Sequence, residues 1–283
     1  MGRRECVRAM AVVAVVLGLL AGCGRPADEI FVISREDGSG TRSAFTKLVG
    51  VQGENGESED RTVDTAEITN STGVMLSSVA ENRNAIGYVS LGALNDRVKA
   101  LAVDGVAPTT ENVRNGSYPV RRAFQIVLRS EMSPATQDFV AFILSDYGQT
   151  VVDASGYVSG GNGGVFSGGL VSGKITVSGS SSVFPVMEKL AEAYMARNNR
   201  VNIVLQTSDS TTGIRDAADG LCDVGMSSRD LTDNERGGLH IVTIAWDGIA
   251  VIVHPENSVE GLSCRQICDI YTGAVTGWAQ LQA

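Results

Sequence analysis

Short runs of apolar, β-forming residues alternate along the chain with segments whose apolar residues recur at helical spacing. Strands are predicted at residues 29–34, 85–90, 122–128, 175–177, 201–205 and 223–226. Helices are predicted at residues 41–48 and 135–147, after 70–73 and 208–213, and from residue 186, where a stripe is formed by Val186, Met187, Leu190, Tyr194 and Met195. This alternation predicts an α/β fold with central sheets flanked by helices.

Two such segments flank a stretch from Ser159 to Gly173 that has seven glycines in fifteen residues and no apolar periodicity. That composition predicts a flexible connector. Further on, Ile241–Val253 is a long apolar run of β-forming residues, interrupted by Trp246-Asp247-Gly248. A run of this length favours a strand that crosses between two domains, and a chain of 283 residues is long enough for two.

The N-terminus has the pattern of an export signal. Arg3, Arg4 and Arg8 precede an apolar run over residues 9–20, which is too short for a comfortable transmembrane helix. The run ends in Leu20-Ala21-Gly22-Cys23, which resembles the bacterial lipobox. We therefore expect a lipoprotein signal peptide at 1–22, a lipid on Cys23, an anchor linker at 23–28 and a place on the outer face of the bacterial cell membrane. The alternative is a plain secretory signal with an accidental cysteine.

Charge and cysteine content narrow the function further. Without residues 1–22 the chain has 20 basic and 31 acidic side chains, a net charge of −11, which argues against nucleic acid as a partner. Any anion site must then rely on local backbone N–H groups and a chosen arginine. Besides the lipid-bearing Cys23, three cysteines remain, Cys222, Cys264 and Cys268, and an odd number argues against a disulfide framework. With only two histidines and no zinc-like spacing, we expect no metal site.

Four polar, glycine-bearing loops each follow a predicted strand and precede a predicted helix: residues 34–41, 70–73, 178–182 and 208–213. In open α/β sheets that position is the ligand crevice. Helix N-termini there present free N–H groups and the positive end of the helix dipole, and hydroxyl groups add donors, so the loops suit a tetrahedral oxyanion. The alternative is that they are ordinary helix caps and turns, which use the same residue types.

The loop at residues 34–42 carries an arginine whose fork can make two charge-assisted bonds to an oxyanion. With its Arg35 followed by Ser39-Gly40-Thr41, it closely resembles the signature of the periplasmic phosphate-binding proteins of Pst-type ABC transporters. The resemblance continues over nearly the whole mature chain, in the segments 85–89, 180–185, 210–214, 223–229, and 269–273 followed by Trp278.

The resemblance implies a two-lobe periplasmic binding protein fold of the Venus-flytrap type, with two crossover strands. It implies that the anion is bound from one lobe by Arg35, Ser39, Gly40 and Thr41, and from the other by Ser181, Ser182, Val183, Phe184, Ser210 and Ser228. Supporting roles fall to Ser180, Thr211 and Arg229, and to Asp37, which is expected to orient Arg35. One departure is Ser228, which stands where many members carry an aspartate that accepts the ligand's proton. Discrimination between phosphate and sulfate is therefore open.

The order of these segments differs from that of the family. There the serine-rich segment comes first, whereas here the chain begins just before the arginine loop and ends just after Trp278. A circular permutation accounts for this order, and a piece of a tandem duplicate or a truncated gene is the alternative. We place the crossings near residues 119–123 and 246–249. One lobe then spans 120–247 and contains the connector, and the other combines 29–119 with 248–283.

The function that this implies is capture of inorganic phosphate between the lobes and delivery to the membrane permease of an ABC transporter, by a monomer without cofactor or covalent chemistry. One alternative is a carrier or sensor for another oxyanion, such as sulfate, molybdate or tungstate. An enzyme, for example a surface phosphatase with Ser39 or Ser181 as nucleophile, lacks a recognisable base. A non-functional product of gene rearrangement is the remaining alternative.

Overall fold

The computed structural model describes residues 28–53, 59–161 and 163–281. The predicted signal peptide, Cys23 and most of the anchor linker lie outside these residues. One mixed sheet runs through the molecule in the order β2-β1-β3-β11-β6-β10-β8-β9, with β4 and β7 also paired to β11. Its strands are β1 (Phe31–Arg35), β2 (Glu67–Thr69), β3 (Ala85–Ser90), β4 (Lys99–Ala100), β6 (Arg121–Arg129), β7 (Val158–Ser159), β8 (Gly173–Ser180), β9 (Val201–Ser208), β10 (Val224–Ser227) and β11 (Leu239–Val253). A separate parallel pair joins β5 (Ala102–Val103) to β12 (Gly261–Leu262).

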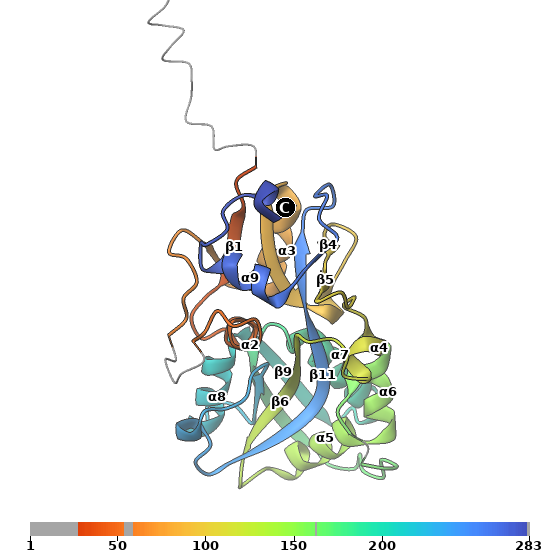
Figure 1. The fold of residues 1–283 in the computed structure, drawn as a ribbon. Helices are drawn as coiled ribbons and strands as arrows, with labels where there is room; N and C mark the ends of the chain where they lie inside the picture. Colours follow the sequence, from red (N-terminus) through yellow and green to blue (C-terminus); the bar gives the residue numbers. More distant parts are fainter. Residues whose placement is uncertain (1–27, 54–58, 162, 282–283) are drawn as a thin grey trace, which may run out of the picture.

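Helices pack on this sheet in two groups (Figure 1). The upper lobe of the figure holds α2 (Gly40–Leu48), α3 (Thr72–Glu81), η1 (Leu91–Ala93), α9 (Cys264–Tyr271) and η3 (Trp278–Leu281). The lower lobe holds α5 (Pro134–Leu144), α6 (Asp146–Ala154), α7 (Phe184–Arg197), α8 (Ser210–Asp219) and η2 (Asp233–Glu235). The short helix α4 (Thr110–Arg114) lies near the junction, and α2 sits where the two lobes meet.

The strand β11 joins the two lobes, as the long apolar run predicts. Its first part, Leu239–Gly248, pairs with β6 in the lower lobe, and its last part, Ile249–Val253, pairs with β3 in the upper lobe. The register shifts between Thr243 and Ala245, which marks a β-bulge. Figure 1 shows this strand running without a break from one lobe to the other.

The hydrophobic core is divided in the same way. One cluster lies among β6, β8, α5 and α7, with Phe124, Phe139 and Tyr194 among its members, and a second surrounds Phe45, Tyr88 and Tyr271. Burying these large side chains stabilises each lobe by about 25 cal/mol per Å² of apolar surface. The boundaries at 119/120 and 247/248 stay a prediction. Val158 and Trp246, which belong to the predicted lower lobe, pack against the upper cluster, as does Val120.

The beginning and the end of the described chain lie side by side. Glu29 forms an antiparallel bridge with Gly277, the Ile30 N–H donates to the Thr276 carbonyl over 2.8 Å, and the Trp278 N–H donates to the Asp28 carbonyl over 3.0 Å. This pairing brings together the two segments that follow each other directly in the order that the family resemblance implies.

Two expectations need correction or detail. The helix predicted at 135–147 is two helices, because Ser145 adopts an extended conformation, caps the end of α5 and accepts from the Gly148 N–H at the start of α6. The glycine-rich stretch forms no helix or strand over residues 163–172, but Phe166 within it stacks edge-on against Phe142 at 5.3 Å.

Among the described residues, no helix is long and apolar enough to cross a membrane.

Candidate functional site

Four helix N-termini converge at the junction of the lobes, two from each lobe. The Thr41 hydroxyl, at the start of α2, lies 2.7 Å from the Ser182 hydroxyl, which precedes α7. At the start of α3, the Thr72 hydroxyl lies 3.4 Å from those of both Ser181 and Ser182. A Cβ added to Gly40 would collide with Ser210 at the start of α8, so these two helix ends are in close contact. The positive ends of four helix dipoles thus meet at one place, which favours an anion there.

Local chemistry explains why the helices begin where they do. Side chains of Ser39, Ser71 and Asp209 accept a backbone N–H and cap α2, α3 and α8. The capping interpretation therefore holds for three of the loops, but it does not satisfy every donor. Within the described chain, no hydrogen bond uses the N–H groups of Gly40 or Phe184, and α7 has no side-chain cap at all. These N–H groups are available to a ligand.

Arg35 lies within this cluster and is only 2% exposed. Its Nε and Nη2 donate to the two carboxylate oxygens of Glu36, each over 2.8 Å, and Nη2 also donates to the Ser181 hydroxyl over 3.2 Å. The expected contact from Asp37 is therefore corrected: Asp37 is exposed and accepts from Arg42 instead. The two carboxylates are neighbours in one loop, and the turn at Gly38, which has a φ of +89°, lets Glu36 face inward and Asp37 outward.

A second group of predicted residues forms a buried hydroxyl cluster in the lower lobe. Ser180 donates to the Ser228 hydroxyl over 2.9 Å, and the Ser210 and Ser228 hydroxyls are 3.3 Å apart. The Ser228 N–H donates to the Ser210 hydroxyl over 3.0 Å. Both Ser210 and Ser228 are completely buried, so each hydroxyl is held by protein partners and not by solvent.

The remaining predicted residues lie nearby or at the edge. Val183 is the N-cap residue of α7, and Phe184 is the first residue of that helix. Thr211 reaches across the lobes, since its N–H and its hydroxyl each donate to the Gly38 carbonyl over 3.2 Å. Arg229 donates to the Thr211 hydroxyl but makes its main ion pair with Glu235, away from Arg35. Arg229 therefore supports a contact between the lobes at the rim of the cluster.

Sequence reasoning missed Arg122 and Asp247, which form an ion pair between the two crossing strands. Both Nε and Nη2 of Arg122 donate to Asp247 Oδ2, over 3.1 and 3.0 Å. The third nitrogen, Nη1, donates to the Thr41 hydroxyl over 2.8 Å and to the Ser228 carbonyl over 3.3 Å. The signal was present, because a charged residue in each of two buried strands requires a partner.

The electrostatics of the junction rest on two arginine–carboxylate pairs, whose formal charges cancel. Burial lowers the pKa of Arg122, and the nearby Arg35 charge adds to this, while Asp247 opposes it. Burial likewise raises the pKa of Asp247, against the effect of Arg122 and of the hydrogen bonds from Ser90 and Leu91. An anion at this junction would be attracted by both guanidinium groups and by the helix ends.

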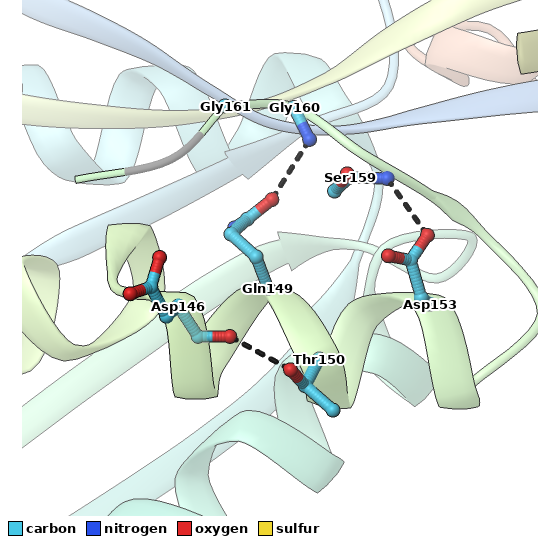
Figure 2. A pocket seen from close by; sticks show the side chains of 7 residues that line it. All are labelled: Asp146, Gln149, Thr150, Asp153, Ser159, Gly160 and Gly161. Atoms are coloured by element: carbon cyan, nitrogen blue, oxygen red, sulfur yellow. Dashed lines mark hydrogen bonds between the residues drawn. The ribbon is translucent and has the colours of Figure 1, made fainter. Parts of the chain in front are cut away.

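Of two hollows on the described surface, one lies apart from the hydroxyl cluster and the other is lined in part by Arg122, which bonds to that cluster. One, of about 570 Å³, lies between α6 and β7 (Figure 2). Its polar groups already bond to one another, since Gln149 accepts from the Gly160 N–H and Asp153 from the Ser159 N–H, so it serves to fasten the chain that leads into the connector. The other, of about 930 Å³, lies between the lobes on the side of Lys47, Arg121 and Trp246.

The described residues also include potential metal ligands and three cysteines. Within the residues the structure describes, no group of three or more histidine, cysteine, aspartate or glutamate residues is placed to hold a metal ion. Cys222, Cys264 and Cys268 are all free thiols. Burial raises the pKa of Cys222 to about 11 and that of Cys264 to about 12, which keeps both protonated at neutral pH.

Comparison with known proteins identifies the family. A family model described as "PBP superfamily domain" matches residues 23–147 and 164–283. The protein named "Phosphate-binding protein PstS 2" from Streptococcus agalactiae is 46% identical over 274 residues, which cover 94% of each sequence. The chain belongs to the Pst-type family of phosphate-binding proteins.

The fold of this Pst-type chain agrees with a solved relative. The crystal structure of a phosphate-binding protein of a phosphate ABC transporter from Streptococcus pneumoniae superposes with a TM-score of 0.72 and 43% identity, covering 89% of this chain and 99% of that one. The predicted α/β, two-lobe fold is thereby confirmed.

A more distant relative matches only in part. The phosphate-binding protein PstS of Bacillus subtilis is 31% identical over 134 residues, 46% of this chain and 41% of the relative. A different order of the same segments would limit a match in this way. The circular permutation itself stays a prediction.

Proposed function

We propose that this protein binds inorganic phosphate between its two lobes and delivers it to the permease of an ABC transporter. The single observation that carries the proposal is the convergence of four helix N-termini on Arg35 and a cluster of buried hydroxyls. The proposed ligands are Arg35, Ser39, Gly40 and Thr41 from the upper lobe, and Ser181, Ser182, Val183, Phe184, Ser210 and Ser228 from the lower lobe. The names of the relatives from Streptococcus support phosphate as the ligand.

Binding would exchange contacts between the lobes for contacts to the ligand. Across the junction the Thr41 hydroxyl now bonds to that of Ser182, and the Thr72 hydroxyl bonds to that of Ser181. Each of these hydroxyls can turn toward a phosphate oxygen. Each charge-assisted hydrogen bond contributes about 1.5 to 3 kcal/mol, before the cost of dehydrating the anion is subtracted. A micromolar site needs only about −8 kcal/mol in total, so the proposed donors suffice.

The proposal also covers the location of the protein and the kind of activity that it has. A lipid on Cys23 would hold it as a monomer on the outer face of the cell membrane, beside its permease. The chemistry is binding and release, without a covalent step. In the described chain neither candidate nucleophile bonds to a side-chain base, since the Ser39 hydroxyl accepts from the Arg42 N–H and the Ser181 hydroxyl accepts from Arg35.

Another oxyanion is the second candidate, and one observation favours it. Ser228 offers a hydroxyl where many family members have a proton-accepting aspartate, and it already accepts from Ser180. A site with few acceptors does not reject a fully deprotonated anion such as sulfate. Sulfate therefore belongs in every titration.

Calorimetric titration of the chain from Gly24 onward, with phosphate and then with sulfate, tests the proposal. We expect saturable phosphate binding that Arg35→Ala weakens at least about 100-fold, because two or more charge-assisted bonds are lost. The matched control is Arg265→Ala, which removes an exposed arginine that pairs only with Asp269. The phosphate-capture proposal would be refuted by a folded protein that binds no oxyanion, or by one that turns over a phosphate ester.

A further inference from the structure

Arg122 is a buried arginine that hydrogen-bonds to both lobes where they meet. It lies on the crossing strand β6, directly opposite Asp247 on the crossing strand β11, and the two residues are 5% and 1% exposed. Asp247 uses its second oxygen, Oδ1, to accept from the Ser90 hydroxyl over 2.9 Å and from the Leu91 N–H over 3.1 Å. The carboxylate is thus fixed by the upper lobe, and it in turn fixes the guanidinium.

This arrangement leaves Nη1 of Arg122 to face the site. One of its bonds goes to the Thr41 hydroxyl, which belongs to the upper lobe, and the other to the Ser228 carbonyl, which belongs to the lower lobe. Both acceptors are within reach only when the lobes are together. Opening the lobes would leave at least one N–H of a nearly buried guanidinium without its partner, which is unfavourable.

The bond to Thr41 also sets the direction of its hydroxyl. A guanidinium can only donate, so the Thr41 oxygen must accept, and its own hydrogen is then free to donate. In this structure the nearest oxygen is that of Ser182, at 2.7 Å. With an anion at the junction of the helix ends, the same hydrogen would point to an anion oxygen.

We propose that Arg122 is a positioning residue of the anion site, held by Asp247, that aims the Thr41 hydroxyl at the ligand and ties the Ser228 backbone to the closed form. This inference rests on the proposed phosphate function. It deepens that function, because it makes the two crossing strands part of the binding machinery and assigns the second arginine of the site a role in affinity.

The alternative is that the Arg122–Asp247 pair has a purely structural role, and the test must distinguish this from a role in binding. Removing Arg122 alone would leave a buried, unpaired carboxylate and destabilise the fold, whatever its role in binding. Replacing both partners by neutral residues of similar shape removes that problem, because buried ion pairs add little net stability. The double variant Arg122→Gln/Asp247→Asn therefore keeps the fold and loses only the aimed donor.

The test measures the phosphate Kd by calorimetry and the Tm by thermal unfolding for the wild type, the double variant, Asp247→Asn and Arg122→Lys. We expect the double variant to keep its Tm within a few degrees and to bind phosphate about 10- to 100-fold more weakly. Arg122→Lys should fall between it and the wild type, because lysine keeps the charge but not the fork. Arg121→Gln, on the same strand and exposed, is the control and should bind as the wild type does.

The outcomes are distinguishable. If the wild type binds phosphate and the folded double variant binds it within about threefold as tightly, the positioning role is overturned and the phosphate function stands. If the wild type binds no phosphate, both claims fall. Should the double variant not fold, Arg122→Lys decides, because it keeps the charge pair with Asp247 and loses the fork: unchanged phosphate affinity in that variant overturns the inference.

Discussion

At the scale of the residue, the site depends on hydroxyl groups whose hydrogens are directed by fixed donors. Arg122 donates to Thr41, the Ser182 N–H donates to Ser180, and Ser180 donates to Ser228. The Ser180 hydrogen is thereby used, but the Thr41 and Ser228 oxygens act as acceptors in these bonds, so their own hydrogens can serve a ligand. Such a site is rich in donors and poor in acceptors, which bears directly on the ligands it prefers.

Ser228→Asp should convert the site into one that selects phosphate. The new carboxylate would be buried and would accept the proton of hydrogen phosphate, whereas sulfate brings no proton and would be repelled. We expect the ratio of phosphate to sulfate affinity to rise at least about tenfold, a difference of about 1.4 kcal/mol. The effect should hold on both sides of neutral pH, because phosphate carries at least one proton throughout that range, as HPO4²⁻ or H2PO4⁻, and sulfate carries none. Calorimetry on either side of neutral pH measures this.

The control for that prediction is Ser228→Asn, which has a similar shape and no charge. It should leave the ratio of the two affinities near that of the wild type. An unchanged ratio in Ser228→Asp would mean that the ligand does not approach this residue, and would remove Ser228 from the proposed set of ligands.

Which residues form the site was only partly readable from the sequence. The arginine loop and the serine-rich loops were found because their spacing is that of helix N-termini. The sequence did not reveal that Glu36, and not Asp37, contacts Arg35. Both are carboxylates in the same loop, and only the conformation of the turn decides which of them faces inward. Arg122 was passed over because its role depends on a partner that is 125 residues away in sequence.

At the scale of the element, the N-termini of α2 and α8 pack so closely that there is no room for a side chain at Gly40. Gly40 begins α2 and faces Ser210 and Ser228 of the other lobe, and a Cβ added there would lie 2.7 Å from the Ser228 hydroxyl oxygen. Gly73 occupies the corresponding first turn of α3, and a Cβ added there would meet nothing within 4 Å. A methyl side chain at Gly40 would therefore contact the other lobe, whereas one at Gly73 would not.

Gly40→Ala should weaken phosphate binding without unfolding the protein. Alanine suits the first turn of a helix, so α2 should form, but its methyl group would hold the lobes apart. We expect at least about 100-fold weaker binding, since closure of the site is hindered. Gly73→Ala, the matched control, should bind within about threefold of the wild type. Titration with phosphate, followed by the emission of Trp246 in a Trp278→Phe background, measures both binding and closure.

Trp246 is suited to this readout because it lies on the crossing strand, lines the second hollow between the lobes and has the Arg121 guanidinium 5.2 Å from its ring centroid. Equal phosphate affinity and equal emission change in both glycine variants would show that the helix ends separate on binding, contrary to the closed arrangement proposed for the complex.

Some helices and strands can be predicted from local sequence patterns alone, and others cannot. The strand predicted at 85–90 is β3, and the helix predicted at 41–48 is α2 with one further residue, because clear apolar runs and a serine cap define both. The break at Ser145 was missed, since the apolar spacing of α5 continues past it toward α6. The short strands β4 and β7 were also missed, since two-residue strands exist only through their pairing with β11.

At the scale of the whole molecule, one sheet spans both lobes, and the chain passes between them on the two crossing strands β6 and β11. The closed form is held by the bonds of Thr41, Thr72 and Thr211 across the junction. Because the crossing strands carry Arg122 and Asp247, hinge and site share the same residues. In the proposed function, ligand binding and lobe closure are then a single event.

The order of the chain can be tested at this scale too. The described ends are paired through Glu29 and Gly277, so a linker of about five residues, which reaches at most about 17 Å, could join Leu281 to Asp28. New ends between Gly169 and Leu170 would fall in the connector, where Leu170 is 86% exposed. The rearranged protein would have the order that the family resemblance implies, with the serine-rich segment first.

We expect this rearranged protein to fold cooperatively and to bind phosphate within about threefold of the original, because every strand pairing and every proposed ligand is kept. A control opened between Asp247 and Gly248 cuts the strand that both lobes share and should not give a folded, binding protein. Calorimetric phosphate titration and thermal unfolding of the two proteins measure the difference. A connector-opened protein that fails to fold would show that the glycine-rich stretch, with Phe166 packed against Phe142, is a structural part of the lower lobe, and would argue against permutation as the origin of the order.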